Sequence, residues 1–376
     1  MKLTCFLLAL IVLGCAAPQP QNAQQTISDI SEPDTKTYEL QLVVPELDIP
    51  WGMTFLPDGS MLITEKKGRL LHHKDGQTTE VSGLPESLYV RGQGGLLDVL
   101  AHPNYAENGW IYLTMGSSEG DGEGGNTMVI RAKLQNMALT DIEMIYKATP
   151  NTKSGNHWGS RLAFDREGYL YFTIGDRFNR DVNPQDLTRD GGKVYRLHDD
   201  GRIPQNNPFV GQAGAKTAAY SYGHRNPQGM TRHPKTGAIW THEHGPKGGD
   251  EVNIIQPGNN YGWPVITYGR NYTGTSITDE TARPGMEQPL YYWLPSIAPS
   301  GMAFGTAKYP EWEDDLLVGS LKFEYLERLD LEDGKVVARE KLFADVGRVR
   351  SVETDAEGNL YLGVEGKGIF RVVAVE

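Results

Sequence analysis

WGMTFLPDGSMLIT, residues 51–64, holds the unit that repeats along this chain of 376 residues. The unit is an apolar strand, a Pro/Asp/Gly turn and a second strand rich in β-branched and aromatic residues. Further copies begin at residues 95, 161, 228, 300 and 349. In several copies a third strand follows, with a basic residue inside an apolar run, as in GRLLHH at residues 68–73. Each copy therefore offers three or four short strands joined by turns.

These repeats predict an all-β protein, because no long stretch of the chain has a helical period. Self-similarity at roughly 40–80 residues per copy is typical of propeller blades. The six copies predict a six-bladed β-propeller of four-stranded antiparallel blades, since closing a ring protects strand edges that an open stack would expose. The apolar strand at residues 38–45 is expected to complete the blade that begins at residue 349. We expect a single domain over residues 38–376.

The N-terminal residues predict export. Lys2 precedes a short apolar run that is too short to span a bilayer as a helix, so residues 1–14 are expected to be a signal peptide. The residues before Cys15 resemble a bacterial lipobox, which predicts lipidation of Cys15; an ordinary signal peptide cut nearby is the alternative. Residues 15–37 are rich in Gln, Pro, Ser, Thr and Asp and predict a disordered tether. We therefore expect a periplasmic lipoprotein anchored to the membrane through Cys15.

The formal net charge of −12 argues against a nucleic-acid partner, because a phosphate backbone demands a basic footprint. The two cysteines, Cys5 and Cys15, both lie before the expected domain. A domain of this length can bury a large core without disulfides.

Polar, glycine-flanked segments interrupt the repeats. The segments are GQGGLLDVLAHP (92–103), NHWGSRLAF (156–164), TIGDR (173–177), YGHRNPQG (222–229), EHGPKGGDE (243–251), NYGWP (260–264), SLK (320–322) and GRVR (347–350). In their order and in their residues they resemble the signature segments of the soluble PQQ-dependent sugar dehydrogenases, the soluble quinoprotein glucose dehydrogenase family. The resemblance implies an aldose sugar dehydrogenase with PQQ and Ca²⁺ as cofactors. It implies oxidation of the sugar at C1 to the lactone, with electrons passed to an external quinone or cytochrome.

His157 stands at the position of the family's general base, and imidazole suits this task because it ordinarily titrates close to working pH. Asp176 matches the carboxylate that orients and charges that base. By the same resemblance, Arg225 lies over the quinone oxygen that gains negative charge. Taken alone, His157 could be an ordinary loop histidine and Asp176 a turn-forming residue.

A tricarboxylate quinone needs fixed cations, and arginine binds carboxylates with two donors and keeps its charge. No GxGxxG stands between a strand and a helix, so a nicotinamide-binding fold is not expected. The resemblance assigns the cofactor to Arg225, Asn226, His244, Ser296, Lys322, Arg348 and Arg350. Taken one at a time, each of the cations could be an ordinary surface residue.

The EHGPKGGDE segment resembles the family's calcium loop, where backbone carbonyls serve a hard cation. The resemblance gives the Gly245 and Pro246 carbonyls to a calcium ion at the quinone, where it would act as an electrophile. Glu251 and the Tyr261 carbonyl would hold a second, structural calcium ion.

Gln93, Asn156 and Trp293 are expected to line the sugar pocket. Leu294 stands where the glucose-specific members have a wall tryptophan, which favours the broader aldose branch. Two other functions stay open on the residues alone. A calcium-dependent propeller lactonase would not need Lys322, Arg348 and Arg350, and a non-catalytic propeller would only bind carbohydrate or protein.

Overall fold

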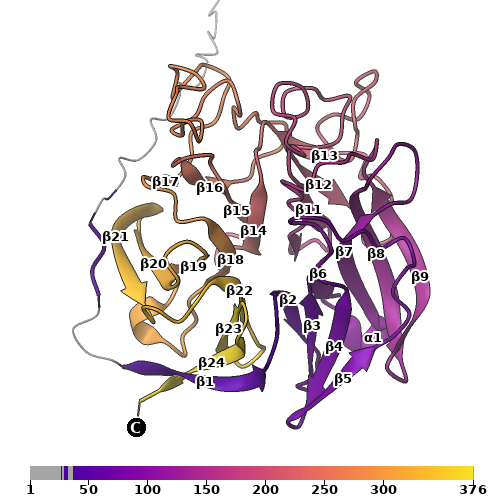
Figure 1. Cartoon of the computed structure of the whole chain (residues 1–376), viewed down its shortest axis with the longest axis vertical. Helices are drawn as coiled ribbons and strands as arrows, with labels where there is room; N and C mark the ends of the chain where they lie inside the picture. Colours follow the sequence, from indigo (N-terminus) through magenta and orange to yellow (C-terminus); the bar gives the residue numbers. More distant parts are fainter. Residues whose placement is uncertain (1–26, 28, 33–36, 376) are drawn as a thin grey trace, which may run out of the picture.

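Antiparallel pairing groups the strands into six four-stranded sheets, which stand around a central axis as the blades of a β-propeller (Figure 1). The computed structural model describes residues 27, 29–32 and 37–375. The predicted six-bladed, all-β architecture is confirmed. Within these ranges, helical structure is limited to α1 (Tyr105–Asn108) and one 3-10 helix at Pro310–Trp312.

Five blades are each built from four strands that follow one another in the sequence. Blade 1 consists of β2 (Pro50–Phe55), β3 (Met61–Glu65), β4 (Arg69–Lys74) and β5 (Gln77–Val81). Blade 2 consists of β6 (Leu96–Ala101), β7 (Trp110–Ser117), β8 (Asn126–Gln135) and β9 (Ala138–Lys147). Blade 3 consists of β10 (Leu162–Phe164), β11 (Leu170–Ile174), β12 (Lys193–Leu197) and β13 (Ala219–Tyr222). Blade 4 consists of β14 (Pro227–Arg232), β15 (Ile239–Glu243), β16 (Asp250–Ile254) and β17 (Tyr291–Trp293). Blade 5 consists of β18 (Pro299–Phe304), β19 (Leu316–Ser320), β20 (Leu326–Glu332) and β21 (Lys335–Leu342).

Blade 6 joins the two ends of the described chain. It consists of β22 (Val349–Thr354), β23 (Leu360–Val364), β24 (Gly368–Ala374) and, on its outer side, β1 (Tyr38–Pro45). β1 pairs antiparallel with β24, as predicted, with Tyr38 opposite Ala374 and Pro45 opposite Gly368 (Figure 1). On its inner side β22 contacts β2, so blades 6 and 1 are neighbours at the seam of the ring.

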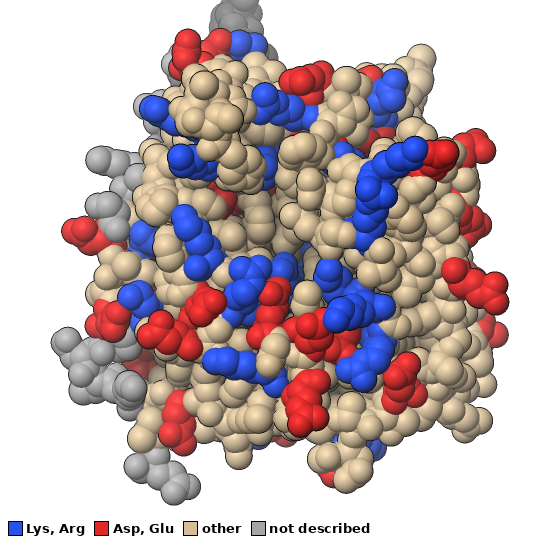
Figure 2. Space-filling view, in the orientation of Figure 1, with Lys and Arg blue, Asp and Glu red and all other residues tan. Residues whose placement is uncertain are grey.

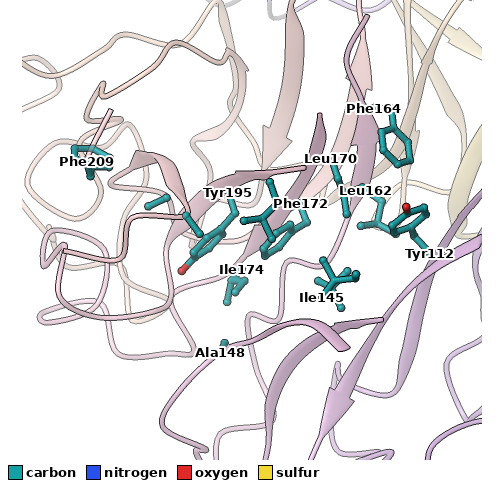
Figure 3. Close-up of a cluster of buried hydrophobic side chains, with 14 residues drawn as sticks. Tyr112, Ile145, Ala148, Leu162, Phe164, Leu170, Phe172, Ile174, Tyr195 and Phe209 are labelled. Atoms are coloured by element: carbon teal, nitrogen blue, oxygen red, sulfur yellow. The ribbon is translucent and has the colours of Figure 1, made fainter. Parts of the chain in front are cut away.

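Neighbouring blades pack face to face through buried apolar side chains. Between blades 2 and 3, Tyr112 and Ile145 join the stacked rings of Phe172 and Tyr195, whose centroids are 4.8 Å apart (Figure 3). Because a blade is covered on both faces, strands such as β3 and β11 are buried along their whole length. This packing places the innermost strands β2, β6, β10, β14, β18 and β22 around the axis.

Residues 27 and 29–32 lie against the outer edge of blade 5, inside the stretch predicted as a tether. The Ser31 N–H donates to the Arg339 carbonyl at 3.1 Å, and the Ser31 carbonyl accepts from the Lys341 N–H at 2.7 Å, which forms a parallel bridge beside β21. Ile27 packs against the cluster between blades 4 and 5. The predicted tether therefore includes a docked segment, because backbone bonds to an exposed strand edge need no apolar run.

The remaining N-terminal predictions fall outside the described residues. The expected signal peptide at 1–14 and Cys15 are among them, so export and lipidation stay predictions. Of the helices in the described ranges, none is long and apolar enough to cross a membrane.

Candidate active site

Three adjoining cavities lie where segments that precede the innermost strands meet segments that follow the second strands of the blades. The base cavity, of about 340 Å³, is lined by His157, Asp176, Phe178, Arg225, Pro246, Trp263 and Tyr272, among others. The cation cavity, of about 360 Å³, is lined by Trp51, Lys66, Gln93, Gln228, His244, Arg348, Arg350 and Glu365, among others. The acidic cavity, of about 10 Å³, is lined by Glu243, Gly245, Glu251 and Tyr261, and it shares Arg225 with the base cavity and His244 with the cation cavity. Strands of blades 1, 4 and 6 contribute residues to these cavities, and so do the segments next to the inner strands of blades 2, 3 and 5.

In the base cavity, His157 is paired with Asp176. Its Nδ1 lies 2.6 Å from Asp176 Oδ1, and the other carboxylate oxygen accepts a hydrogen bond from the Trp263 indole N–H at 2.8 Å. Because an ionised carboxylate only accepts, the proton of the neutral imidazole is assigned to Nδ1, which leaves Nε2 with a free lone pair. Both side chains are buried, with 6% of His157 and none of Asp176 exposed. The carboxylate is held at both oxygens and thereby fixes the ring.

The backbone at His157 adopts a conformation that side chains rarely take. Its φ of 52° lies in the left-handed region, which costs a residue other than glycine about 1–3 kcal/mol. The His157 N–H donates to the Gln93 side chain at 2.7 Å, and the Arg177 guanidinium donates to the carbonyl of Asn156. Gly175 packs so closely that a Cβ there would lie 2.4 Å from the His157 carbonyl oxygen. The surroundings therefore hold the base in a strained position, as is common at functional sites.

Burial, helped by nearby cations, keeps His157 neutral. Burial lowers its pKa below the usual value, and the cations Arg225 and Arg177 lower it further, while Asp176 acts in the opposite direction. An unprotonated Nε2 is the form that a general base requires. The pair can therefore accept a proton from a hydroxyl group placed in the base cavity.

The cation cavity carries more positive than negative charge, although the whole chain is acidic. Arg348 and Arg350 both donate to Glu365, at 2.6 Å and 2.8 Å from their Nε atoms, and Lys66 adds a third cation. Figure 2 shows Lys and Arg side chains, mixed with Asp and Glu, around the hollow at the centre of the ring. A single carboxylate among three cations leaves capacity for a ligand with several carboxylates.

Arg225 and Asn226 keep buried donors that no described residue satisfies. Arg225 Nη1 donates to the carbonyls of His244 and Gly245 at 2.8 and 2.9 Å, but its Nε has no partner among the described residues. Asn226 Oδ1 accepts from the Gly159 N–H at 3.1 Å, while Nδ2 also lacks a partner within the described ranges. Unpaired buried donors cost about 1–3 kcal/mol each. This donor set fits an oxygen-rich group such as a quinone.

The acidic cavity brings together the buried carboxylate of Glu243 and the half-buried carboxylate of Glu251. Burial raises the pKa of Glu251 well above its usual value, and the neighbouring Glu243 raises it further. A cation held between them would remove this repulsion. In the described part of the chain, no group of three or more His, Cys, Asp or Glu side chains is placed to bind a metal, so backbone carbonyls would have to supply much of any coordination sphere.

His244 lines both the acidic cavity and the cation cavity. Its Nε2 lies 2.6 Å from the Pro299 carbonyl, which only accepts, so Nε2 carries the proton and Nδ1 is an acceptor. Burial, together with the charges of Arg225 and Arg350, lowers the pKa of His244 to about 3. The side chain therefore stays neutral in the folded protein at physiological pH.

We expect His244→Gln to make the fold less sensitive to acid. In the unfolded chain a histidine binds its proton below about pH 6.5, whereas folded His244 does not until near its lowered pKa of about 3. The unfolded state therefore binds more protons between these values, and stability is lost as the pH falls through this window. Between pH 7 and pH 5 the Tm of the wild type should fall by roughly 2–4 °C more than that of the variant. If circular dichroism shows the same fall in Tm for the wild type and the variant, His244 does not make the fold sensitive to acid.

Some residues predicted for the site lie elsewhere or act indirectly. Trp293 is fully buried between blades 4 and 5, and its indole N–H donates to Glu327 at 2.8 Å, so it does not line a sugar pocket. The alternation along β17 turns Trp293 and Tyr291 into that core, which corrects the prediction. Asn156 contributes its backbone carbonyl to Arg177 rather than its side chain to a cavity.

Two predicted cofactor residues lie beside the cavities. The Ser296 hydroxyl donates to Asp250 at 2.6 Å, and Asp250 also accepts from the N–H groups of Ile297 and Ala298, so this carboxylate caps the turn. Lys322 is exposed, with its ammonium 4.7 Å from the Phe323 ring centroid, and it directly follows Leu321, which lines the cation cavity.

The sequence did not predict several of the residues that line the cavities, and four of them bear on the site's chemistry. Trp263 binds the carboxylate of Asp176 from 87 residues away, a contact that spacing along the chain does not indicate. Phe178 and Tyr272 line the base cavity with 62% and 68% of their surfaces exposed, and Phe178 stands edge-on to His157 with the ring centroids 5.4 Å apart. Lys66 follows β3 and lines the cation cavity. For Trp263 the sequence did offer a signal, the NYGWP segment, but the prediction took only Tyr261 from it.

Comparison with known proteins shows the family of this chain. The family model described as Glucose / Sorbosone dehydrogenase matches residues 47–371. The chain belongs to this family. Aldose sugar dehydrogenase YliI of Escherichia coli (strain K12) is 40% identical over 334 residues, which cover 87% of this chain and 90% of that protein.

Solved structures of aldose sugar dehydrogenases have a similar fold. The soluble aldose sugar dehydrogenase from Escherichia coli in its apo-form has a TM-score of 0.86 at 38% identity, covering 90% of this chain and 100% of that one. The PQQ-bound form of aldose sugar dehydrogenase from Streptomyces coelicolor has a TM-score of 0.74 at 25% identity, covering 92% of this chain and 100% of that one. The predicted membership of the quinoprotein sugar dehydrogenase family is thus confirmed.

Proposed function

We propose that this chain is an aldose sugar dehydrogenase that depends on PQQ and Ca²⁺ and oxidises the sugar at C1 to the lactone. The His157–Asp176 pair carries the proposal, because it presents an unprotonated Nε2 in a cavity that adjoins a cation-lined one. A PQQ-bound structural neighbour at 25% identity supports the choice of cofactor.

In the proposed reaction His157 Nε2 accepts the proton of the anomeric hydroxyl. The C1–H and O–H bonds break and a C1=O bond forms. Bound PQQ would supply the two-electron acceptor for the hydride that leaves C1. Asp176 stabilises the positive charge that the imidazole gains, and Trp263 keeps this carboxylate in place. Arg225, on the wall shared by the base and acidic cavities, provides fixed positive charge beside the base.

The cofactors would be held by residues at the three cavities. Arg348, Arg350 and Lys322 are the candidates for the carboxylates of PQQ, and the unpaired donors of Arg225 and Asn226 are candidates for its other oxygens. For calcium, the candidates are the carbonyls of Gly245 and Pro246 at one ion and Glu251 with the Tyr261 carbonyl at the other. The support is the repulsion between buried Glu243 and half-buried Glu251, which a cation would neutralise.

We also propose that the protein works outside the cytoplasm, in the periplasm. The support is the apolar run that ends before Cys15. A lipid on Cys15 would hold the propeller at a membrane, where an external acceptor, a quinone or a cytochrome, could receive the electrons. Palmitate labelling that persists in Cys15→Ala would exclude this anchor.

Reconstitution of the purified apoprotein tests the proposed function. Dye-linked oxidation of an aldose should appear only when both PQQ and Ca²⁺ are added, and EDTA should abolish it until Ca²⁺ is restored. The same samples are tested for lactone hydrolysis. Hydrolysis that needs Ca²⁺ but no PQQ would favour a lactonase, and the absence of both activities would favour a binding protein.

A further inference from the structure

Lys66 has an unusual position for a lysine of an acidic protein. It follows β3 of blade 1, is half-buried, and lines the cation cavity together with Arg348 and Arg350 of blade 6. Its ammonium donates to the Gly92 carbonyl at 2.7 Å. Among the described residues it forms no ion pair, whereas its exposed neighbour Lys67 pairs with Asp48 at 3.0 Å. An ammonium has three donors, so at least one remains for a ligand.

The backbone holds Lys66 firmly in this place. Its N–H donates to the Ile49 carbonyl and its own carbonyl accepts from the Leu96 N–H, both at 3.1 Å. Gly95 lies so close that a Cβ there would collide with the Lys66 carbonyl. The residue is therefore fixed between blades 1 and 2, and it faces blade 6 across the seam of the ring.

The charge on Lys66 is only partly balanced. Burial and the positive charge of Arg350 lower its pKa below the usual value, and Asp48 and Glu365 oppose this shift incompletely. Glu365 is already bonded to both Arg348 and Arg350. A cavity with three cations and one shared carboxylate is suited to an anion that reaches across the seam.

We propose that Lys66 binds a carboxylate of the quinone cofactor, as a further cation in addition to Arg348, Arg350 and Lys322. This inference rests on the proposed function in that it takes PQQ as the occupant. It makes the seam between blades 1 and 6 part of the cofactor site, so that residues from the two ends of the chain hold one ligand.

Direct binding of PQQ to the apoprotein tests this proposal without any activity measurement. PQQ is titrated against tryptophan fluorescence, since Trp51 lines the same cavity. Lys66→Met should raise the Kd by about tenfold or more, as expected for loss of a charge-assisted hydrogen bond. Lys66→Arg should remain close to the wild type. Lys67→Met is the matched control, because Lys67 is exposed and pairs with Asp48, and its Kd should not change.

Salt dependence separates binding from a structural role in holding the Gly92 carbonyl. If Lys66 contacts a carboxylate, the Kd of Lys66→Met should rise less steeply with ionic strength than that of the wild type. An unchanged Kd in Lys66→Met, or an unchanged salt dependence, overturns the role of Lys66 and leaves the proposed function intact. If the wild type binds no PQQ, both proposals fail.

Discussion

Replacing His157 with alanine is expected to lower aldose oxidation by the reconstituted holoenzyme by about 10²–10⁴-fold, the usual contribution of a positioned general base. The reason is that Nε2 of this residue is the unprotonated nitrogen of a buried pair whose other nitrogen is bound to Asp176. The loss should appear in kcat, because the variant keeps the cations of the cation cavity and should bind PQQ with a similar Kd.

His72→Ala is the control for this variant, because His72 is half-buried on β4 and lines none of the three cavities. It should retain wild-type turnover. Near-wild-type turnover in His157→Ala with PQQ bound would show that another group removes the proton.

Asp176→Asn is expected to lower turnover by at least about 10²-fold, because the amide does not stabilise the imidazolium and can favour the wrong tautomer. The pH dependence gives a second readout. The Asp176 carboxylate raises the pKa of His157, so its removal should lower that pKa further. The acidic limb of the pH–rate profile should then move to lower pH while the plateau falls. At acidic pH the lower pKa of His157 favours activity, whereas the lower plateau reduces it. A general loss of folding would reduce activity without moving the acidic limb to lower pH.

Asp181→Asn serves as the matched control, since Asp181 lines the same cavity but its side chain is 84% exposed. Its profile should coincide with that of the wild type. An acidic limb that moves to higher pH in Asp176→Asn would contradict the assigned pairing.

The fold could be predicted from the sequence because every blade repeats the same local signals. A strand–turn–strand unit such as residues 51–64 specifies its own pairing, and six such units leave no alternative to a closed ring that buries their edges. The strand at Tyr38–Pro45 was likewise predictable as the closing strand, because it is apolar and lies outside any copy.

The site was predictable only in part. His157 and Asp176 lie 19 residues apart, at the two ends of the hairpin formed by β10 and β11, and their pairing follows from that hairpin. Trp263 reaches Asp176 from the next blade, and Lys66 lines the same cavity as Arg350 across the seam. Such contacts depend on how the blades are placed around the axis, which local patterns do not encode. Trp293 was misplaced for the same reason, because the face of β17 that meets blade 5 is set by packing.

Reduction of enzyme-bound PQQ by an aldose under anaerobic conditions tests the central claim most directly. The holoprotein is mixed with a sugar in the absence of any other acceptor, and the absorbance of the quinone is followed. The account predicts conversion of the bound quinone to its reduced form, with one lactone formed per cofactor, and a much slower conversion in His157→Ala. A quinone that binds but keeps its oxidised spectrum with every aldose tested would contradict the claim.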